Sequence, residues 1–191
     1  MKARRNLSDA WSQCQALAVE AHHCADASQK KRLIQKAFAA GLDAGEPNRV
    51  VSASAWPIKV LAASADDARL EAEAQRLLGI IATEPSPVRR ADALNLILGA
   101  VLAGPRPTFR RVLGSFRQAC STPLLNGKRN KRGESLLARW VPAIHKMDPE
   151  LAREVLASIH GPVLRQRAIT GIQEYETLSL EELCGWPCHG L

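Results

Sequence analysis

The feature that most constrains the fold is a twelve-residue element that occurs twice, 75 residues apart. Ser86-Pro-Val-Arg-Arg-Ala-Asp-Ala-Leu-Asn-Leu-Ile97 returns as Gly161-Pro-Val-Leu-Arg-Gln-Arg-Ala-Ile-Thr-Gly-Ile172. An apolar stretch precedes each copy, and proline is favoured at the first position of a helix. A helix, a break at a proline and a second apolar helix together form one unit of a helical repeat protein. The repeat therefore predicts a stack of helical units.

The rest of the chain also has the pattern of helices. Apolar residues recur at helical spacing, and no stretch shows the sustained alternation of a strand. The clearest stripe contains Leu70, Ala74, Leu77, Leu78 and Ile81. Leu78 and Phe116 are predicted to be almost fully buried. We expect nine helices, over about 8–23, 26–41, 47–56, 64–82, 87–101, 107–120, 133–140, 148–159 and 162–172.

Two prolines within these patterns are expected to disturb helices. Pro57 removes a backbone donor and should kink or break its helix near Trp56, and Pro142 should disturb the end of the helix over 133–140. The segment 121–132 has no apolar pattern and is expected to be irregular. A short turn over 179–183 is expected to cover the last helical pair.

The repeated residues resemble those of the HEAT/armadillo-like α-solenoid class. The identical pairs are Pro87/Pro162, Val88/Val163, Arg90/Arg165, Ala93/Ala168 and Ile97/Ile172. The resemblance is to a fold and covers about 26–175. It implies an all-α fold, a right-handed α-α superhelix of about nine helices in stacked antiparallel hairpins. It also implies a binding role, because HEAT-like proteins commonly bind other proteins along a curved face, and some basic ones bind DNA.

Length and composition agree with this class. The 191 residues suffice for one α-solenoid domain over 1–191, with a capping helix over 1–25, hairpins over 26–175 and a cap or tail over 176–191. Aromatic residues make up 4%, so the core must consist mainly of Leu, Ile, Val and Ala. No apolar run is long enough to span a membrane, and the start lacks the apolar stretch of a secretory signal. A cytoplasmic protein with reduced thiols is therefore expected.

Positive charge is concentrated in one part of the sequence. Residues 104–146 contain ten Lys or Arg and one acid, Glu134, for a net charge of +9. The other residues carry a net charge of −2, so the whole excess of +7 belongs to this segment. Such a run favours an acidic partner or nucleic acid.

Two neighbouring parts of the basic segment supply the candidate binding residues. The helix over 107–120 has an apolar stripe of Phe109, Val112, Leu113 and Phe116, which turns its arginines toward solvent. The loop that follows carries four cations between Asn126 and Gly133. The predicted binding residues are Arg110, Arg111, Arg117, Lys128, Arg129, Lys131 and Arg132. The other interpretation of the loop is a solvated segment without a function.

No enzymatic, metal or cofactor site is predicted. The acids are explained by helix starts and polar faces, and no nucleophile motif or glycine-rich phosphate loop is present. Cys184, Cys188 and His189 have a spacing that is not typical of a redox motif. Together with His22, His23 and Cys24 they could form a zinc site only if the two ends of the chain met, so we expect an unexploited tail.

The function expected from the sequence is a non-enzymatic module for protein–protein interaction that uses the basic surface at 104–146. A protein with an acidic surface is the favoured partner, and no membrane or small-molecule substrate is indicated. One alternative is a HEAT-like protein that binds the phosphate backbone of nucleic acid through the same residues. A second alternative is an inhibitor of the immunity or antitoxin type.

Overall fold

The computed structural model describes residues 7–64 and 66–184, and within these residues the chain is all-α, as predicted. No strand occurs in the described part. The helices are α1 (Leu7–His23), α2 (Ala27–Leu42), α3 (Pro47–Ala62), α4 (Asp67–Ala82), α5 (Pro87–Ala100), α6 (Arg106–Ser121), α7 (Lys131–Met147), α8 (Pro149–Ala157), α9 (Pro162–Glu174) and the short α10 (Leu180–Cys184).

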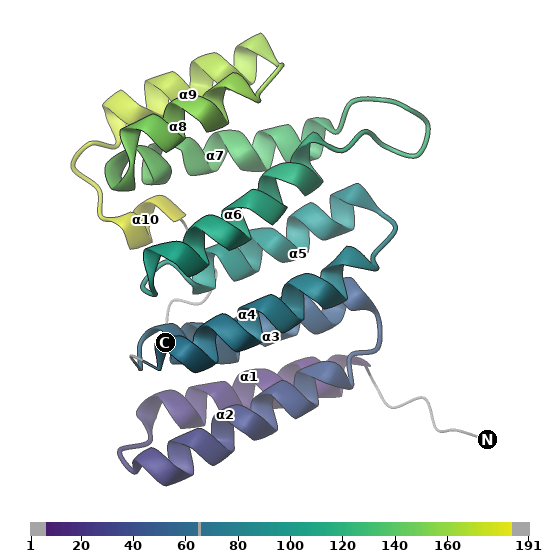
Figure 1. The fold of residues 1–191 in the computed structure, drawn as a ribbon, viewed down its shortest axis with the longest axis vertical. Coiled ribbons are helices and arrows are strands. Elements are labelled where there is room, and N and C mark those ends of the chain that lie inside the picture. The colour runs from purple at the N-terminus through teal and green to yellow at the C-terminus, as the bar shows by residue number, and fades with distance from the viewer. Residues whose placement is uncertain (1–6, 65, 185–191) are drawn as a thin grey trace.

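The helices form two rows (Figure 1). The odd-numbered helices make one row, in which α1 packs on α3, α3 on α5, α5 on α7 and α7 on α9. The even-numbered helices α2, α4, α6 and α8 each pack against the odd helix that precedes them. We call the row of odd-numbered helices the inner row and the row of even-numbered helices the outer row. α1 and α2 lie at one end of the molecule, and α8 and α9 lie at the other (Figure 1).

Short-range sequence signals determine where the helices begin. Pro47, Pro87, Pro149 and Pro162 each occupy the first helical position, where the missing N–H removes no hydrogen bond. Aspartate caps add to this, because the carboxylate accepts a hydrogen bond from a backbone N–H that has no partner within the helix. Asp26 caps α2 and Asp148 caps α8 in this way.

The predicted break of the helix at Pro57 and the predicted helix end near Trp140, at Pro142, are wrong. α3 continues past Pro57 to Ala62, and α7 continues past Pro142 to Met147. An internal proline costs about 3 kcal/mol through a lost hydrogen bond and a steric clash. Each proline is buried and is followed by further buried apolar residues, such as Ile58 and Ile144. Burial of the last turn outweighs the local cost, and tertiary packing therefore keeps both helices continuous.

The apolar stripes of the helices form one core that runs through both rows. Phe116 and Leu77 are completely buried, as their places in the pattern predict. The prediction that Leu78 is nearly fully buried is wrong, since it is only partly buried at the edge of the core. The stripe of α4 is therefore narrower than the sequence indicates, and it is centred on Leu70, Ala74 and Leu77.

The two copies of the repeated element begin equivalent inner helices, α5 and α9. Each copy follows an outer helix, α4 or α8, and each contains a buried alanine, Ala93 or Ala168. α4 packs more closely on α3 than on α5, so the element spans the connection between two hairpins. Ile97 is buried, whereas its counterpart Ile172 is only partly buried. The difference arises because α5 packs on an inner helix on both sides, whereas in the described part of the chain α9 has such a neighbour on one side, α7.

Candidate binding surface

Helix α6 presents its arginines on its outer face. Phe109, Val112, Leu113 and Phe116 are buried against the core, which leaves Arg110 and Arg111 exposed and Arg117 partly exposed. The sequence therefore predicted correctly which face of this helix is apolar. It did not reveal what the arginines meet on the neighbouring helices.

Three of the four arginines of α6, Arg110, Arg111 and Arg117, form ion pairs with the outer helices on either side. The Arg111 Nε atom lies 2.9 Å from a carboxylate oxygen of Glu71 on α4. On the other side, Arg110 lies 2.5 Å from Asp148, the cap of α8, and Arg117 lies 3.4 Å from Glu154 within α8. These contacts are exposed to solvent, so water and salt screen each of them strongly.

The basic loop is shorter than predicted and contains an ordered turn in its middle. α6 ends at Ser121 and α7 begins at Lys131, so the connection covers 122–130. The backbone N–H of Gly127 donates to Leu124, and Gly127 has a φ of 73°, in the region that favours glycine. At the end of the loop Asn130 is buried and caps α7.

A close approach of two backbones holds the start of α7 against the end of α6. A Cβ atom on Gly133 would lie 2.7 Å from both Cys120 Cα and the Cys120 carbonyl oxygen. The Asn130 side chain accepts from the Gly133 N–H and donates to the carbonyl of Ala119. The loop is therefore fixed at its basic end, where Lys131 and Arg132 belong to the first turn of α7.

Two of the four loop cations also have acidic partners. Arg129 lies 3.1 Å from Glu134, whose side chain is almost fully buried. Glu134 also accepts the backbone N–H of Gly161 and lies 3.5 Å from His160, so it joins the loop to the turn before α9. Arg132 donates from Nε and Nη2 to one oxygen of Asp92 on α5, at 3.1 and 3.0 Å.

The structure therefore divides the seven predicted binding residues into two groups. Five of them, Arg110, Arg111, Arg117, Arg129 and Arg132, form ion pairs with acids. Lys128 and Lys131 are exposed and form no ion pair with a described residue. Much of the positive charge in the 104–146 segment is thus balanced by acids from other parts of the chain.

The polar contacts between helices recur at a regular distance in the sequence. They join neighbours within one row and are separated by 36 to 45 residues. In the inner row Arg89 contacts Asn48, and Trp140 contacts Asn95; in the outer row the Arg76 guanidinium lies over the Phe38 ring. The spacing matches one pair of helices, so each contact joins one helical pair to the next.

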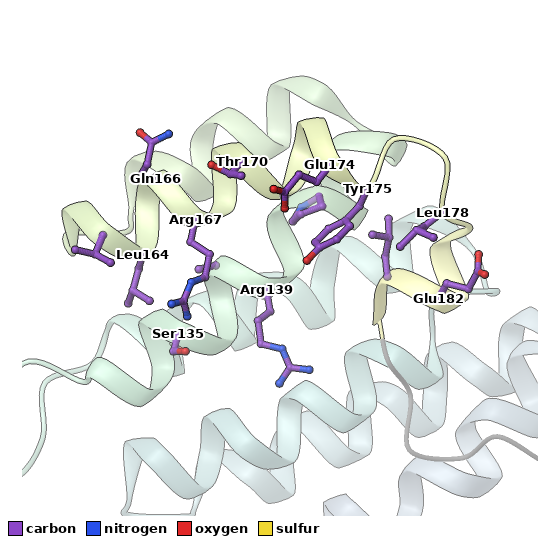
Figure 2. A pocket seen from close by; sticks show the side chains of 15 residues that line it. Ser135, Arg139, Leu164, Gln166, Arg167, Thr170, Glu174, Tyr175, Leu178 and Glu182 are labelled. Atoms are coloured by element: carbon purple, nitrogen blue, oxygen red, sulfur yellow. The ribbon is translucent and has the colours of Figure 1, made fainter.

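A second surface, which the sequence did not single out, lies at the end of the stack. A cavity of about 690 Å³ opens between α7, α9 and the segment that leads into α10. Its lining includes Ala138, Pro142, Leu164, Leu178 and Leu183, with Tyr175 beside them (Figure 2). We call this the C-terminal groove. A volume of this size lies within the range of ligand-binding clefts.

Two arginines without acidic partners line the C-terminal groove. Arg139 comes from α7 and Arg167 from α9, and neither forms an ion pair or side-chain hydrogen bond with a described residue. Arg167 reaches from α9 toward α7, beside Ser135 (Figure 2). Arg139 belongs to the basic segment of the sequence, but Arg167 lies outside it. Glu174 and Glu182 line the groove as well, so its apolar wall carries both signs of charge. The Glu182 carboxylate accepts the backbone N–H of Ser179, whereas the two arginines have no such partner among the described residues.

Within the described residues, no group of three or more His, Cys, Asp or Glu is arranged to hold a metal ion. Cys188 and His189 lie outside the described residues. None of the helices in the described part has both the length and the apolar character needed to cross a bilayer.

Comparison with known proteins finds no matching family model, curated protein or solved structure.

Proposed function

We propose that this chain is a non-enzymatic protein-interaction module that binds its partner through the C-terminal groove. The observation that supports this most directly is the combination of apolar lining with Arg139 and Arg167, which have no acidic partner among the described residues. Protein interfaces characteristically combine a buried apolar centre with arginine.

The proposal includes a specific architecture, a right-handed α-α superhelix of the HEAT/armadillo-like class. The packing of each odd helix on the next supports it, as does the 36- to 45-residue spacing of the polar contacts. In such a repeat every unit contacts only its neighbours, so the last unit has a face that no further unit covers. The C-terminal groove belongs to this last part of the stack and lies between α7 and α9.

The alternative function is binding to the phosphate backbone of nucleic acid. Phosphate contacts need cations that are free to replace counterions. Five of the seven predicted cations are already paired with carboxylates, which weakens this alternative. Lys128 and Lys131 remain as candidates for electrostatic steering of a partner.

A cytoplasmic location is also part of the proposal, and the free thiols of Cys14 and Cys120 support it.

Affinity purification from the native host, with and without nuclease, tests the proposal. The bait proteins are the wild type, Arg139→Glu/Arg167→Glu and the control Arg32→Glu/Lys36→Glu. The control changes the net charge equally on α2, where both residues are exposed. We expect one protein partner to stay bound to the wild type and to the control after nuclease treatment. A partner that is lost with nuclease would contradict the proposal in favour of nucleic acid.

A further inference from the structure

Helix α5 uses two side chains to hold the next inner helix, and the matching positions of α9 are open. Asp92 accepts from Arg132 of α7, and Asn95 accepts the indole N–H of Trp140 at 2.8 Å. The 75-residue repeat aligns Asp92 with Arg167 and Asn95 with Thr170. Arg167 and Thr170 both line the C-terminal groove, and neither has a side-chain hydrogen bond to a described residue. The two positions that join α5 to α7 are therefore without side-chain partners in α9, where they line a groove shared with α7.

The apolar residues of α9 are also more exposed to solvent than their counterparts in α5. Val88 of α5 is partly buried, whereas its counterpart Val163 is 72% exposed. Tyr175, at the end of α9, is 44% exposed although it lines the same groove. Exposed apolar side chains that adjoin a lined cleft are typical of an interaction site.

Another helix already lies against this face of α7. α10 packs on α7, and Leu180 and Leu183 from this short helix contact the apolar core. α10 has only five residues, and the lining by Leu164, Arg167 and Thr170 extends along α9 beyond it. The shape of the groove and the packing of α10 thus both favour a helical occupant.

The two unpaired arginines indicate the chemistry of that occupant. The glutamates of the lining lie apart from Arg167, with Glu174 beside Tyr175 and Glu182 beyond Leu178 (Figure 2). In α5 the contact position is the acid Asp92, which meets an arginine. In α9 the same position is Arg167, which has no acidic partner among the described residues and can bind a carboxylate as a ligand. Arg165, two residues earlier, donates to the Ile159 carbonyl and is not available. Arg139 adds a second guanidinium from the α7 side.

We propose that the C-terminal groove binds an amphipathic α-helix of a partner protein, with apolar side chains against Leu164 and Pro142 and carboxylates on Arg139 and Arg167. This inference rests on the proposed function and specifies its partner. An amphipathic helix in an apolar groove is a common mode of peptide recognition, with anchors spaced three and four residues apart. Arginine is suited to the carboxylate contact because its planar guanidinium can form two parallel hydrogen bonds.

Selection from a phage library of random 16-residue peptides tests this inference. The immobilised proteins are the full-length wild type, Arg139→Glu/Arg167→Glu and the control Arg32→Glu/Lys36→Glu. We expect peptides selected on the wild type to carry Asp or Glu beside Leu, Ile or Phe at helical spacing. Synthetic peptides from this pool should bind at least about tenfold more weakly to the groove variant and equally to the control, a loss in the range measured for interface arginines.

Charge reversal in the peptide gives a second readout. Replacing its acids with Lys should abolish binding to the wild type and restore binding to Arg139→Glu/Arg167→Glu, which a merely misfolded variant could not show. Four results would overturn the inference: no enrichment over uncoated surface, a pool without acids, equal binding to the groove variant, or displacement of the peptide by a random DNA duplex. Self-association of the wild type that the groove substitutions abolish would assign the groove to a second copy and overturn it as well.

The two experiments separate failure of the inference from failure of the proposed function. A nuclease-resistant partner that binds wild type and Arg139→Glu/Arg167→Glu equally would leave protein binding in place and remove the groove as its site. Loss of the partner on nuclease treatment would instead remove the proposed function itself.

Discussion

The indole N–H of Trp140 donates a hydrogen bond to the side-chain oxygen of Asn95, 45 residues earlier, at a distance of 2.8 Å. Trp140 is 4% exposed and its ring packs beside Phe109, so the hydrogen bond lies at the junction of α5, α6 and α7. A buried indole N–H needs such a partner, because it cannot reach water. The contact therefore fixes the relative position of two inner helices.

We expect Asn95→Leu to lower the free energy of unfolding by about 1–3 kcal/mol, because the buried Trp140 donor loses its acceptor. Urea denaturation measures the loss. A double-mutant cycle with Trp140→Phe provides the control, since the double variant should be less destabilised than the sum of the single variants. Additive losses would show that the hydrogen bond does not contribute to stability.

Gly133→Ala should destabilise the protein by about 1–3 kcal/mol, the usual cost of overpacking a close contact. The added methyl group would lie 2.7 Å from backbone atoms of Cys120, which cannot move without shifting α6. Gly114→Ala is the matched control within α6, where a Cβ atom meets nothing within 4 Å. The control should instead gain about 0.5–1 kcal/mol from improved helix propensity. Equal effects of the two substitutions in thermal denaturation would contradict the close approach.

Local signals determined most of what could be predicted about the fold. Prolines and caps act on their own helix, so the starts at Pro87, Pro149 and Pro162 follow from a few adjacent residues. The continuation of α7 past Pro142 depends on burial of Val141 and Ile144 by other helices, which the local sequence does not contain.

The same distinction applies to the candidate site. The apolar stripe of α6 predicted the outward direction of Arg110 and Arg111, but their acidic partners, the α8 cap Asp148 and Glu71 on α4, lie 38 and 40 residues away in the sequence. The C-terminal groove was missed for the same reason, since its two arginines are separated in sequence and meet only after α9 packs on α7. The mismatch between Asp92 and Arg167 within the repeat was the available signal.

Two adjacent leucines in α4 should differ strongly in their contribution to stability. Leu77→Ala should cost about 2–5 kcal/mol, because the side chain is completely buried and its removal leaves a cavity. Leu78 is only partly buried, so Leu78→Ala should cost clearly less. Phe116→Ala, at another completely buried position, should cost about 3–5 kcal/mol. Chemical denaturation that ranks Leu78→Ala above Leu77→Ala would show that α4 packs by a different face.

Asp148 should contribute to the acid sensitivity of the fold. Its hydrogen bond from the Leu151 backbone N–H, followed by its contact with Arg110, holds the pKa of its carboxyl below the ordinary 3.8. A lowered acid pKa gives stability that is present above the unfolded pKa and is lost as the pH falls through the folded value. Asp148→Asn keeps a capping side chain, so it should reduce the loss of stability between pH 5 and pH 2, near and below the usual range of aspartate. Identical pH profiles of wild type and variant in urea denaturation would contradict this assignment.

The two groups of loop cations should give different phenotypes. Arg129→Ala/Arg132→Ala removes the partners of buried Glu134 and of Asp92, so it should lower the free energy of unfolding measured in urea. Lys128→Ala/Lys131→Ala removes no ion pair with a described residue and should leave stability within about 0.5 kcal/mol.

In surface plasmon resonance with the nuclease-resistant partner, Lys128→Ala/Lys131→Ala should mainly slow association, and the effect should fade at high salt, because exposed charges at the rim steer encounter. Arg139→Glu/Arg167→Glu should instead speed dissociation, since its residues line the groove itself. If a DNA duplex were the ligand, the lysine variant would flatten the salt dependence of binding by about two units for every duplex sequence alike. If the association rate of Lys128→Ala/Lys131→Ala equals that of the wild type at every salt concentration, the loop lysines do not face the partner. The groove arginines alone would then account for the charge preference of the partner.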